Sequence, residues 1–131
     1  MEEKIIRFFE KKREVAAVYV FGSFASGRHR SDSDLDIGVL LHPEFLETAE
    51  ALREQCMVQL GRILRKDIHL VILNHAGEVL LKQVLSKGKA ILVKNPKVDK
   101  YFKMVSLSRI VDFNYHLEKM QAGLTKKILE S

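Results

Sequence analysis

Four short apolar segments, separated by stretches with helical spacing, place the strongest constraint on how this chain folds. They span residues 16–21, 34–41, 68–73 and 90–93, and their many β-branched and aromatic side chains are typical of buried strands. Apolar residues three or four apart precede the first segment and follow each of the others. Helices that alternate with strands pack on the faces of a common sheet. The sequence therefore predicts an α/β (α+β) fold with about four strands flanked by helices.

The helical segments have recognisable ends. The first is predicted over residues 2–13, with acidic residues first and basic residues last, which complements the helix dipole. Pro43 is expected to open the second helix, and residues 78–87 form the third. Gly88 follows the third helix directly, where a left-handed cap is common.

The last helical segment, residues 98–131, is long for a chain of this size. A helix of about 30 residues spans roughly 45 Å, which exceeds the width of a domain built from 131 residues. The sequence leaves two alternatives for its apolar side. It either folds back on the sheet or faces a partner, which includes a second copy of the chain.

Composition limits the class of protein. We expect one domain over residues 1–131, with a core in residues 1–95 and the helical segment after it. The net charge of +5 favours anionic partners. The single cysteine, Cys56, excludes an internal disulfide, and no apolar run approaches the ~20 residues of a membrane span. Since residues 1–4 also lack the features of a signal peptide, we expect a cytoplasmic protein without a membrane partner.

One motif indicates chemistry: Gly22-Ser23, ten further residues, and then Asp34-Leu35-Asp36 at the head of a strand. Residues two apart in a strand point to the same face, so the two carboxylates lie side by side. Their mutual repulsion is relieved by a divalent cation, and hard oxygen ligands favour Mg²⁺ or Mn²⁺.

The glycine and serine add a phosphate-binding element to the carboxylates. Gly22 lets the backbone approach a phosphate closely, and Ser23 offers it a hydroxyl and an N–H group. A Walker A loop is excluded, because Arg28 and His29 stand where lysine and serine or threonine are required. These residues together indicate metal-assisted phosphoryl or nucleotidyl transfer.

The complete pattern resembles the nucleotidyltransferase superfamily of the polymerase β type. The short length is similar to the minimal nucleotidyltransferases, which occur as antitoxin partners of HEPN-domain ribonucleases, and the resemblance covers residues 1–95. It implies a mixed β-sheet, ATP as the nucleotide donor and two Mg²⁺ ions. It also implies that Asp34 and Asp36 are catalytic metal ligands and that Gly22 and Ser23 bind phosphate.

The resemblance further implies a third catalytic and metal-binding carboxylate on a neighbouring strand, and Asp67 matches it by position. The alternative is that Asp67 is merely an exposed residue at the start of a strand. His69 shares a face with Asp67 and is interpreted as a polar residue on the open face of the sheet.

Basic residues lie between the turn and the carboxylates. Arg28 and Arg30 are well placed to bind a triphosphate, although a solvated loop explains them equally well. Many members of the family carry arginine where this chain has Ser26, so the phosphate-binding arginine expected at that point is missing.

The resemblance implies a Mg²⁺-dependent enzyme that transfers AMP from ATP to a hydroxyl of a partner macromolecule. The implied acceptor is a tyrosine of a cognate HEPN toxin, which makes the chain an antitoxin. Two alternatives remain open. The chain either neutralises a partner by binding alone, or it modifies a small molecule of the aminoglycoside type held at a homodimer interface.

Overall fold

The computed structural model describes residues 1–23, 25 and 34–130 of the chain. Its elements in chain order are α1 (Glu2–Glu10), β1 (Val15–Phe21), β2 (Leu35–Leu41), a 3-10 helix (Pro43–Thr48), α2 (Ala49–Leu64), β3 (Ile68–Ile72), a second 3-10 helix (Leu73–His75), α3 (Glu78–Lys87), β4 (Lys89–Val93) and α4 (Pro96–Glu130).

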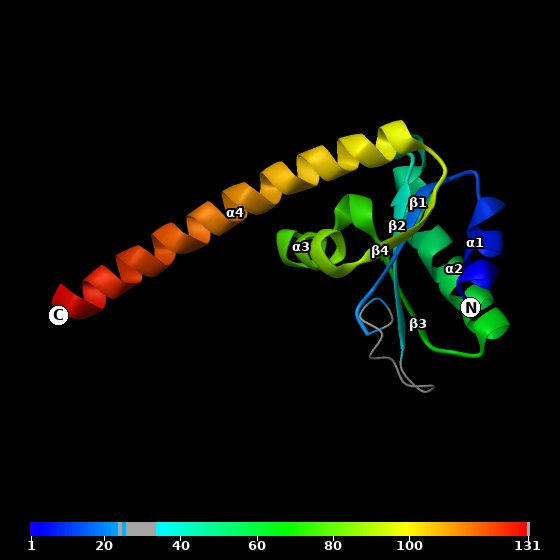
Figure 1. Ribbon diagram of the computed structural model, residues 1–131, viewed down its shortest axis with the longest axis horizontal. Helices are drawn as coiled ribbons and strands as arrows, with labels where there is room; N and C mark the ends of the chain where they lie inside the picture. Colours follow the sequence, from blue (N-terminus) through cyan, green and yellow to red (C-terminus); the bar gives the residue numbers. More distant parts are fainter. Residues whose placement is uncertain (24, 26–33, 131) are drawn as a thin grey trace.

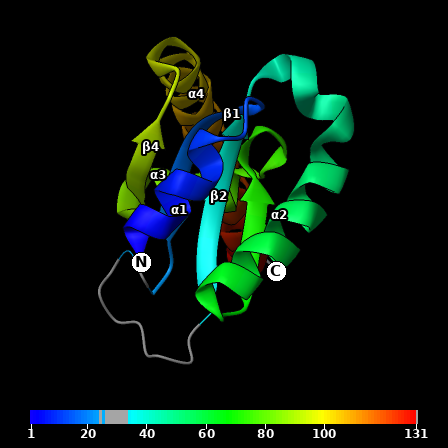
Figure 2. The same ribbon diagram turned by 90° about the vertical axis from the view of Figure 1, so that its right-hand side faces the viewer.

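The four strands form one sheet in the order β3-β2-β1-β4. Strand β1 pairs antiparallel with β2 on one side and with β4 on the other, whereas β2 pairs parallel with β3. The parallel pair is joined through α2, since parallel neighbours require a crossover connection. Figure 2 shows the strands side by side, with β4 at one edge. The predicted α+β fold with a mixed, four-stranded sheet is confirmed.

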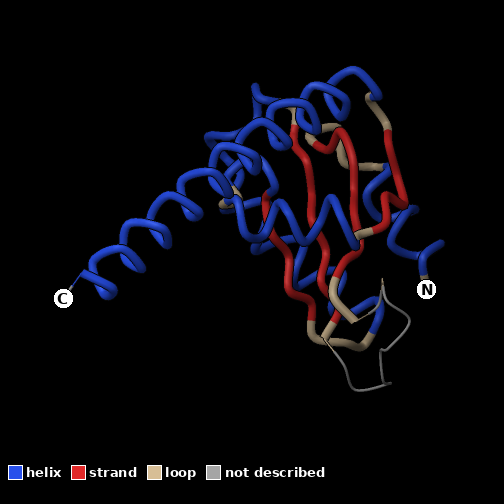
Figure 3. Tube along the Cα trace, turned by 60° about the vertical axis from the view of Figure 1, so that its left-hand side comes forward, coloured by secondary structure: helices blue, strands red, loops and turns tan. Residues whose placement is uncertain are grey.

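Helices cover both faces of the sheet (Figures 1 and 3). Helices α1 and α2 pack on one face, where Phe9 and Leu60 are fully buried among the alternate residues of the strands. Helix α3 and the beginning of α4 pack on the other face, where Val84 and Phe102 meet Tyr19 of β1. Burial of apolar side chains on both faces explains why the strand segments read as nearly continuous apolar runs.

The left-handed cap predicted at Gly88 is wrong. Its backbone is extended, with φ −79° and ψ 166°, and it leads directly into β4. Glycine is needed here for space, because a Cβ would overlap the carbonyl oxygen of Val84. The left-handed residue that ends a helix is instead Arg65, after α2, with φ 54° and ψ 43°.

The beginning of α4 is fixed to the sheet by buried polar groups. The Tyr19 hydroxyl of β1 donates a hydrogen bond to Asp99 Oδ1, and Asp99 is only 4% exposed. Lys103 Nζ lies 3.1 Å from the other oxygen of this carboxylate. Burial raises the pKa of the Tyr19 phenol well above its ordinary value, and the hydrogen bond to Asp99 and its charge raise it further.

This hydrogen bond should make the fold sensitive to alkali. The unfolded chain ionises Tyr19 near pH 10, while the folded protein keeps the phenol protonated to higher pH. The folded state then binds more protons, so the free energy of unfolding should fall above pH 10 by up to about 1.4 kcal/mol per pH unit. Urea unfolding between about pH 8 and 11 measures this slope.

Tyr19→Phe should remove that part of the slope. It should also lower stability by about 1–3 kcal/mol at neutral pH, because buried Asp99 Oδ1 loses its donor while Lys103 still contacts the other oxygen. Tyr101→Phe is the matched control, since Tyr101 is 70% exposed and its removal should change neither quantity. An alkaline slope that is unchanged in Tyr19→Phe would contradict this assignment.

Helix α4 extends far beyond the sheet (Figure 1). Its contact with the body ends near Ile110, and no residue between 111 and 129 is buried. The apolar side therefore folds back on the sheet only over its first part. No helix in the described part of the chain, α4 included, is long and apolar enough to cross a membrane.

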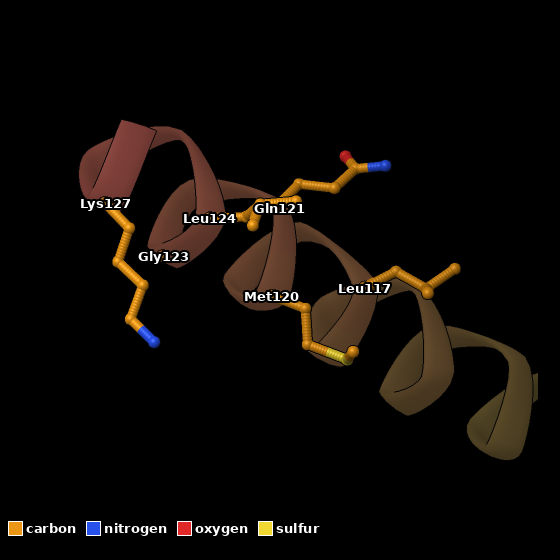
Figure 4. Close-up of a pocket in the computed structure, with 6 residues that line it drawn as sticks. All are labelled: Leu117, Met120, Gln121, Gly123, Leu124 and Lys127. Carbon is orange, nitrogen blue, oxygen red and sulfur yellow. The ribbon is translucent and has the colours of Figure 1, made fainter. Parts of the chain in front are cut away.

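One side of α4 continues from the buried part into the projecting part. Its residues are three or four apart and are called the α4 stripe: Ser106, Ile110, Phe113, Leu117, Met120 and Leu124. The exposed fraction rises from 8% at Ile110 to 39% at Leu117 and 70% at Met120. Figure 4 shows the last three of these side chains on the projecting helix.

Candidate functional site

The Gly-Ser turn and the Asp-Leu-Asp segment meet at one end of the sheet because β1 and β2 are antiparallel neighbours. Phe21, the last residue of β1, pairs with Asp36, and Gly22 follows it directly. Gly22 has a φ of +70°, a conformation that glycine adopts far more readily than other residues. A Cβ here would lie 3.2 Å from Asp36 Cγ and would overlap Oδ2. The turn therefore passes directly against the Asp36 carboxylate.

The strand alternation determines which way the Asp36 carboxylate points. Its neighbours Leu35 and Ile37 are fully buried in the cluster beneath α1 and α2. Asp36 consequently points to the opposite face, where its side chain is 27% exposed. Asp34 lies just before β2 and is exposed. Asp34 precedes the strand, so its place on the same face as Asp36 stays a prediction.

The parallel pairing of β2 with β3 brings a histidine to Asp36. His69 is the register partner of Asp36, and its Nδ1 lies 2.9 Å from Asp36 Oδ1. The histidine side chain is 61% exposed, so the pair is open to solvent. Alternation within the strand placed His69 on the polar face, but only the strand order shows that it contacts Asp36.

Asp67 lies one residue before β3, and its side chain is exposed. Its carbonyl oxygen accepts a hydrogen bond of 3.0 Å from the Leu35 backbone N–H, which brings the Asp67 backbone beside the start of β2. The role of its carboxylate stays a prediction. Ser23 follows Gly22 and is half-buried, and its contact with phosphate is likewise a prediction. Arg28, Arg30 and Ser26 lie outside the described residues, together with the predictions made for them.

The residues at this end of the sheet fit a divalent cation. Among the described residues, no three side chains of His, Cys, Asp or Glu are grouped so as to hold a metal by themselves. Mg²⁺ rarely uses such a complete protein cage, and it is usually held by one or two carboxylates together with substrate phosphates. Asp34 and Asp36 supply the carboxylates, and the absence of a side chain at Gly22 leaves room against Asp36. Such a donor set would suit a cation held jointly by the protein and a nucleotide.

A fold of this kind, with paired carboxylates beside a Gly-Ser turn, defines a nucleotidyltransferase. Residues 3–97 match the family model described as polymerase beta, nucleotidyltransferase. The chain belongs to this family, and the recognition made from the Gly-Ser and Asp-x-Asp motif is confirmed.

A curated relative has a more specific description than the family model. The protein adenylyltransferase MntA of Shewanella oneidensis is 34% identical over 89 residues, which are 67% of this chain. The matched part spans 62% of the length of that relative.

Solved structures resemble the chain over almost its whole length. A toxin–antitoxin crystal structure with AMP-PNP contains a chain 27% identical, with a TM-score of 0.72 and 98% of both chains covered. A structure of a tri-AMPylated Shewanella oneidensis HEPN toxin in complex with MNT antitoxin has a TM-score of 0.66 at 26% identity, covering 98% of this chain and 95% of that one. Because nearly all of this chain is covered, these likenesses extend into α4.

Proposed function

We propose that the protein is a Mg²⁺-dependent nucleotidyltransferase that transfers AMP from ATP to a tyrosine hydroxyl of a cognate HEPN-type toxin, and that it thereby acts as an antitoxin. The observation that carries this proposal is the Asp36 carboxylate at the start of β2, in direct contact with the Gly22 turn. Such an arrangement puts a cation-binding group next to a phosphate-binding backbone. The family membership and the relatives described above support the same activity.

We assign each residue of the site a separate role in the reaction. Asp34 and Asp36 bind the Mg²⁺ ions, of which we propose two, and Gly22 and Ser23 bind the triphosphate through backbone and hydroxyl groups. Bound Mg²⁺ neutralises phosphate charge and polarises the phosphate that is attacked. Asp67 also contacts the metal and accepts the proton of the acceptor hydroxyl. The hydroxyl oxygen forms a bond to the α-phosphorus as the bond to pyrophosphate breaks.

Arg28 and Arg30 are included in the proposal as phosphate ligands on the ground of charge alone. The cytoplasm is the proposed location, where ATP is available and where Cys56, buried in α2 and without a disulfide, remains reduced.

Mass spectrometry of the partner tests this function. The full chain is co-expressed with a candidate HEPN-type toxin, and that partner is then searched for tyrosine carrying one or more AMP groups. We expect AMP only when the chain has both carboxylates of the Asp-Leu-Asp segment. Neutralisation of the partner without any added AMP would favour binding alone, and AMP found only on aminoglycosides would favour the small-molecule activity.

We also propose that the α4 stripe is the surface that binds this partner. Leu117, Met120 and Leu124 continue the spacing of buried Ile110, but nothing in the described chain covers them. An apolar stripe with three- and four-residue spacing fits a facing helix. The chains from toxin–antitoxin crystals that resemble this one are matched over 98% of its length, which supports a toxin as the occupant.

Substitution of this stripe should separate binding from folding. Met120→Asp with Leu124→Asp should weaken partner binding by roughly 30-fold or more, because loss of buried interface anchors costs about 2 kcal/mol or more. Both side chains are over 60% exposed, so thermal stability should not change. Val111→Asp is the matched control, since Val111 is 65% exposed and lies on another side of α4.

Titration calorimetry and light scattering measure the outcome. A partner affinity that is unchanged by the double substitution would contradict this role of the stripe. A dimer of the chain alone that dissociates on the same substitution would show instead that the stripe binds a second copy.

A further inference from the structure

Strand β3 places the imidazole of His69 beside the Asp36 carboxylate. Parallel register pairs Asp36 of β2 with His69 of β3, and His69 Nδ1 lies 2.9 Å from Asp36 Oδ1. If the register continues one residue back, Asp67 stands beside Asp34. The side chain next to the Asp36 carboxylate is therefore that of His69, whose ring nitrogen can bind a metal ion.

The position of His69 is not explained by packing. Its neighbours in β3, Ile68 and Leu70, are 7% and 2% exposed, whereas the His69 side chain is 61% exposed. It lies on the sheet face to which Asp36 points, at the end of the sheet where Gly22 contacts that carboxylate. An exposed contact between a histidine and a carboxylate contributes little to stability.

We propose that His69 is a ligand of the divalent cation that accompanies the nucleotide, and that it binds the ion through Nδ1 next to Asp36 Oδ1. This inference rests on the proposed nucleotidyltransferase function. Binding through Nδ1 requires the tautomer with its proton on Nε2, in which the Nδ1 lone pair faces the ion in place of the present hydrogen bond with Asp36.

The separation of the two atoms agrees with shared coordination. Ligand atoms about 2.1 Å from an octahedral ion lie roughly 3 Å apart when they occupy neighbouring positions. The hydrogen bond between His69 Nδ1 and Asp36 Oδ1 is 2.9 Å long, so the two atoms are already close enough to bind one ion without a large movement. The carboxylates of the proposed site and the nucleotide phosphates supply the remaining ligands.

A nitrogen ligand changes which cation the site prefers. Mg²⁺ favours oxygen ligands, whereas imidazole suits transition metals, so a site of imidazole and carboxylate accepts Mn²⁺ more readily than an all-oxygen site does. The ratio of Mn²⁺ affinity to Mg²⁺ affinity should therefore be higher in the native protein than in His69→Asp.

Pulsed electron paramagnetic resonance of bound Mn²⁺ tests the inference directly. The full chain is labelled with ¹⁵N-histidine and loaded with Mn²⁺ and AMP-PNP, so that nitrogen of the protein is distinguished from ¹⁴N of the nucleotide. We expect ¹⁵N coupling to Mn²⁺ in the native protein and its loss in His69→Ala. The control is His75→Ala, which removes another exposed histidine just after β3 and should keep the coupling.

Mn²⁺ affinity in the presence of AMP-PNP gives the second readout. His69→Ala should lower it by roughly tenfold or more, and His69→Asn, which keeps a donor for Asp36 but ligates poorly, should not restore it. Thermal unfolding checks that each variant is folded.

The outcomes separate the two proposals. Mn²⁺ and AMP-PNP that bind without ¹⁵N coupling, with full affinity in His69→Asn, would overturn the role of His69 as a ligand and leave the proposed function intact. Failure of the native protein to bind Mn²⁺ with AMP-PNP would overturn the proposed function and, with it, the role of His69.

Discussion

Asp36→Asn is expected to lower AMP transfer to the partner by roughly 10³-fold or more, and Asp34→Asn by a similar factor. Each change removes a negative charge that holds the cation against the nucleotide, so the loss appears in the chemical step. Asp36 is the more constrained of the two, because its carboxylate contacts both the Gly22 turn and His69. Incorporation of labelled AMP into the purified partner measures the effect.

Folding should survive these substitutions. Asparagine has nearly the shape of aspartate, and the side chains replaced are exposed or partly exposed, so stability should stay within about 0.5 kcal/mol of the native value. Asp112→Asn is the matched control, since Asp112 is exposed on α4 far along the chain from the motif. Transfer that persists in Asp36→Asn at more than about a tenth of the native rate would contradict the assignment of the metal site.

Local pattern was sufficient to predict the strands and the motif. The apolar segments had the length and composition of buried strands, and the observed β1 to β4 differ from the predicted ranges by only a few residues. Asp36 could be placed on the face opposite to its apolar neighbours because strand alternation depends on a residue's position in its own segment. Helix α3 was predicted with its observed bounds, 78–87, because its helical spacing is likewise a local pattern.

Contacts between distant segments could not be predicted in this way. The approach of His69 to Asp36 depends on β3 being the parallel neighbour of β2, and the strand order is set by packing across the whole sheet. The Tyr19–Asp99 hydrogen bond joins residues 80 positions apart. Gly88 failed as a cap because the nearby Val84 backbone, rather than the local dihedral preference, selects glycine there.

The point at which α4 leaves the body of the protein also depends on contacts between distant segments. Its apolar spacing is continuous through Ile110 and Leu117, so the sequence offers no signal for the point at which the helix leaves the sheet. The helix leaves the body near the start of α3, where Arg109 Nη2 forms an ion pair of 3.1 Å with Glu78 Oε1.

Gly22→Ala should cause the second large loss of activity, although it changes no group that takes part in the chemistry. With φ at +70°, alanine is strained by about 1–2 kcal/mol, which should appear as a loss of stability. Its Cβ would also overlap Asp36 Oδ2, so the carboxylate must rotate or the turn must move away from it. A displacement of about 1 Å in a catalytic group can cost roughly 10²-fold in rate, and we expect AMP transfer to fall by that factor or more.

The design of this experiment separates displacement of Asp36 from simple unfolding. Transfer is measured well below the melting temperature of Gly22→Ala, where the variant is folded and a stability loss of about 1–2 kcal/mol has no effect on the folded fraction. Gly77→Ala is the matched control, because an added Cβ there meets no atom within 4 Å and Gly77 has a negative φ of −79°. If Gly22→Ala retained native turnover, the Asp36 carboxylate would not need its present position against the turn. The proposal that the turn binds phosphate beside Asp36 would then lose its support, since Gly22 gives both the left-handed backbone and the space beside that carboxylate.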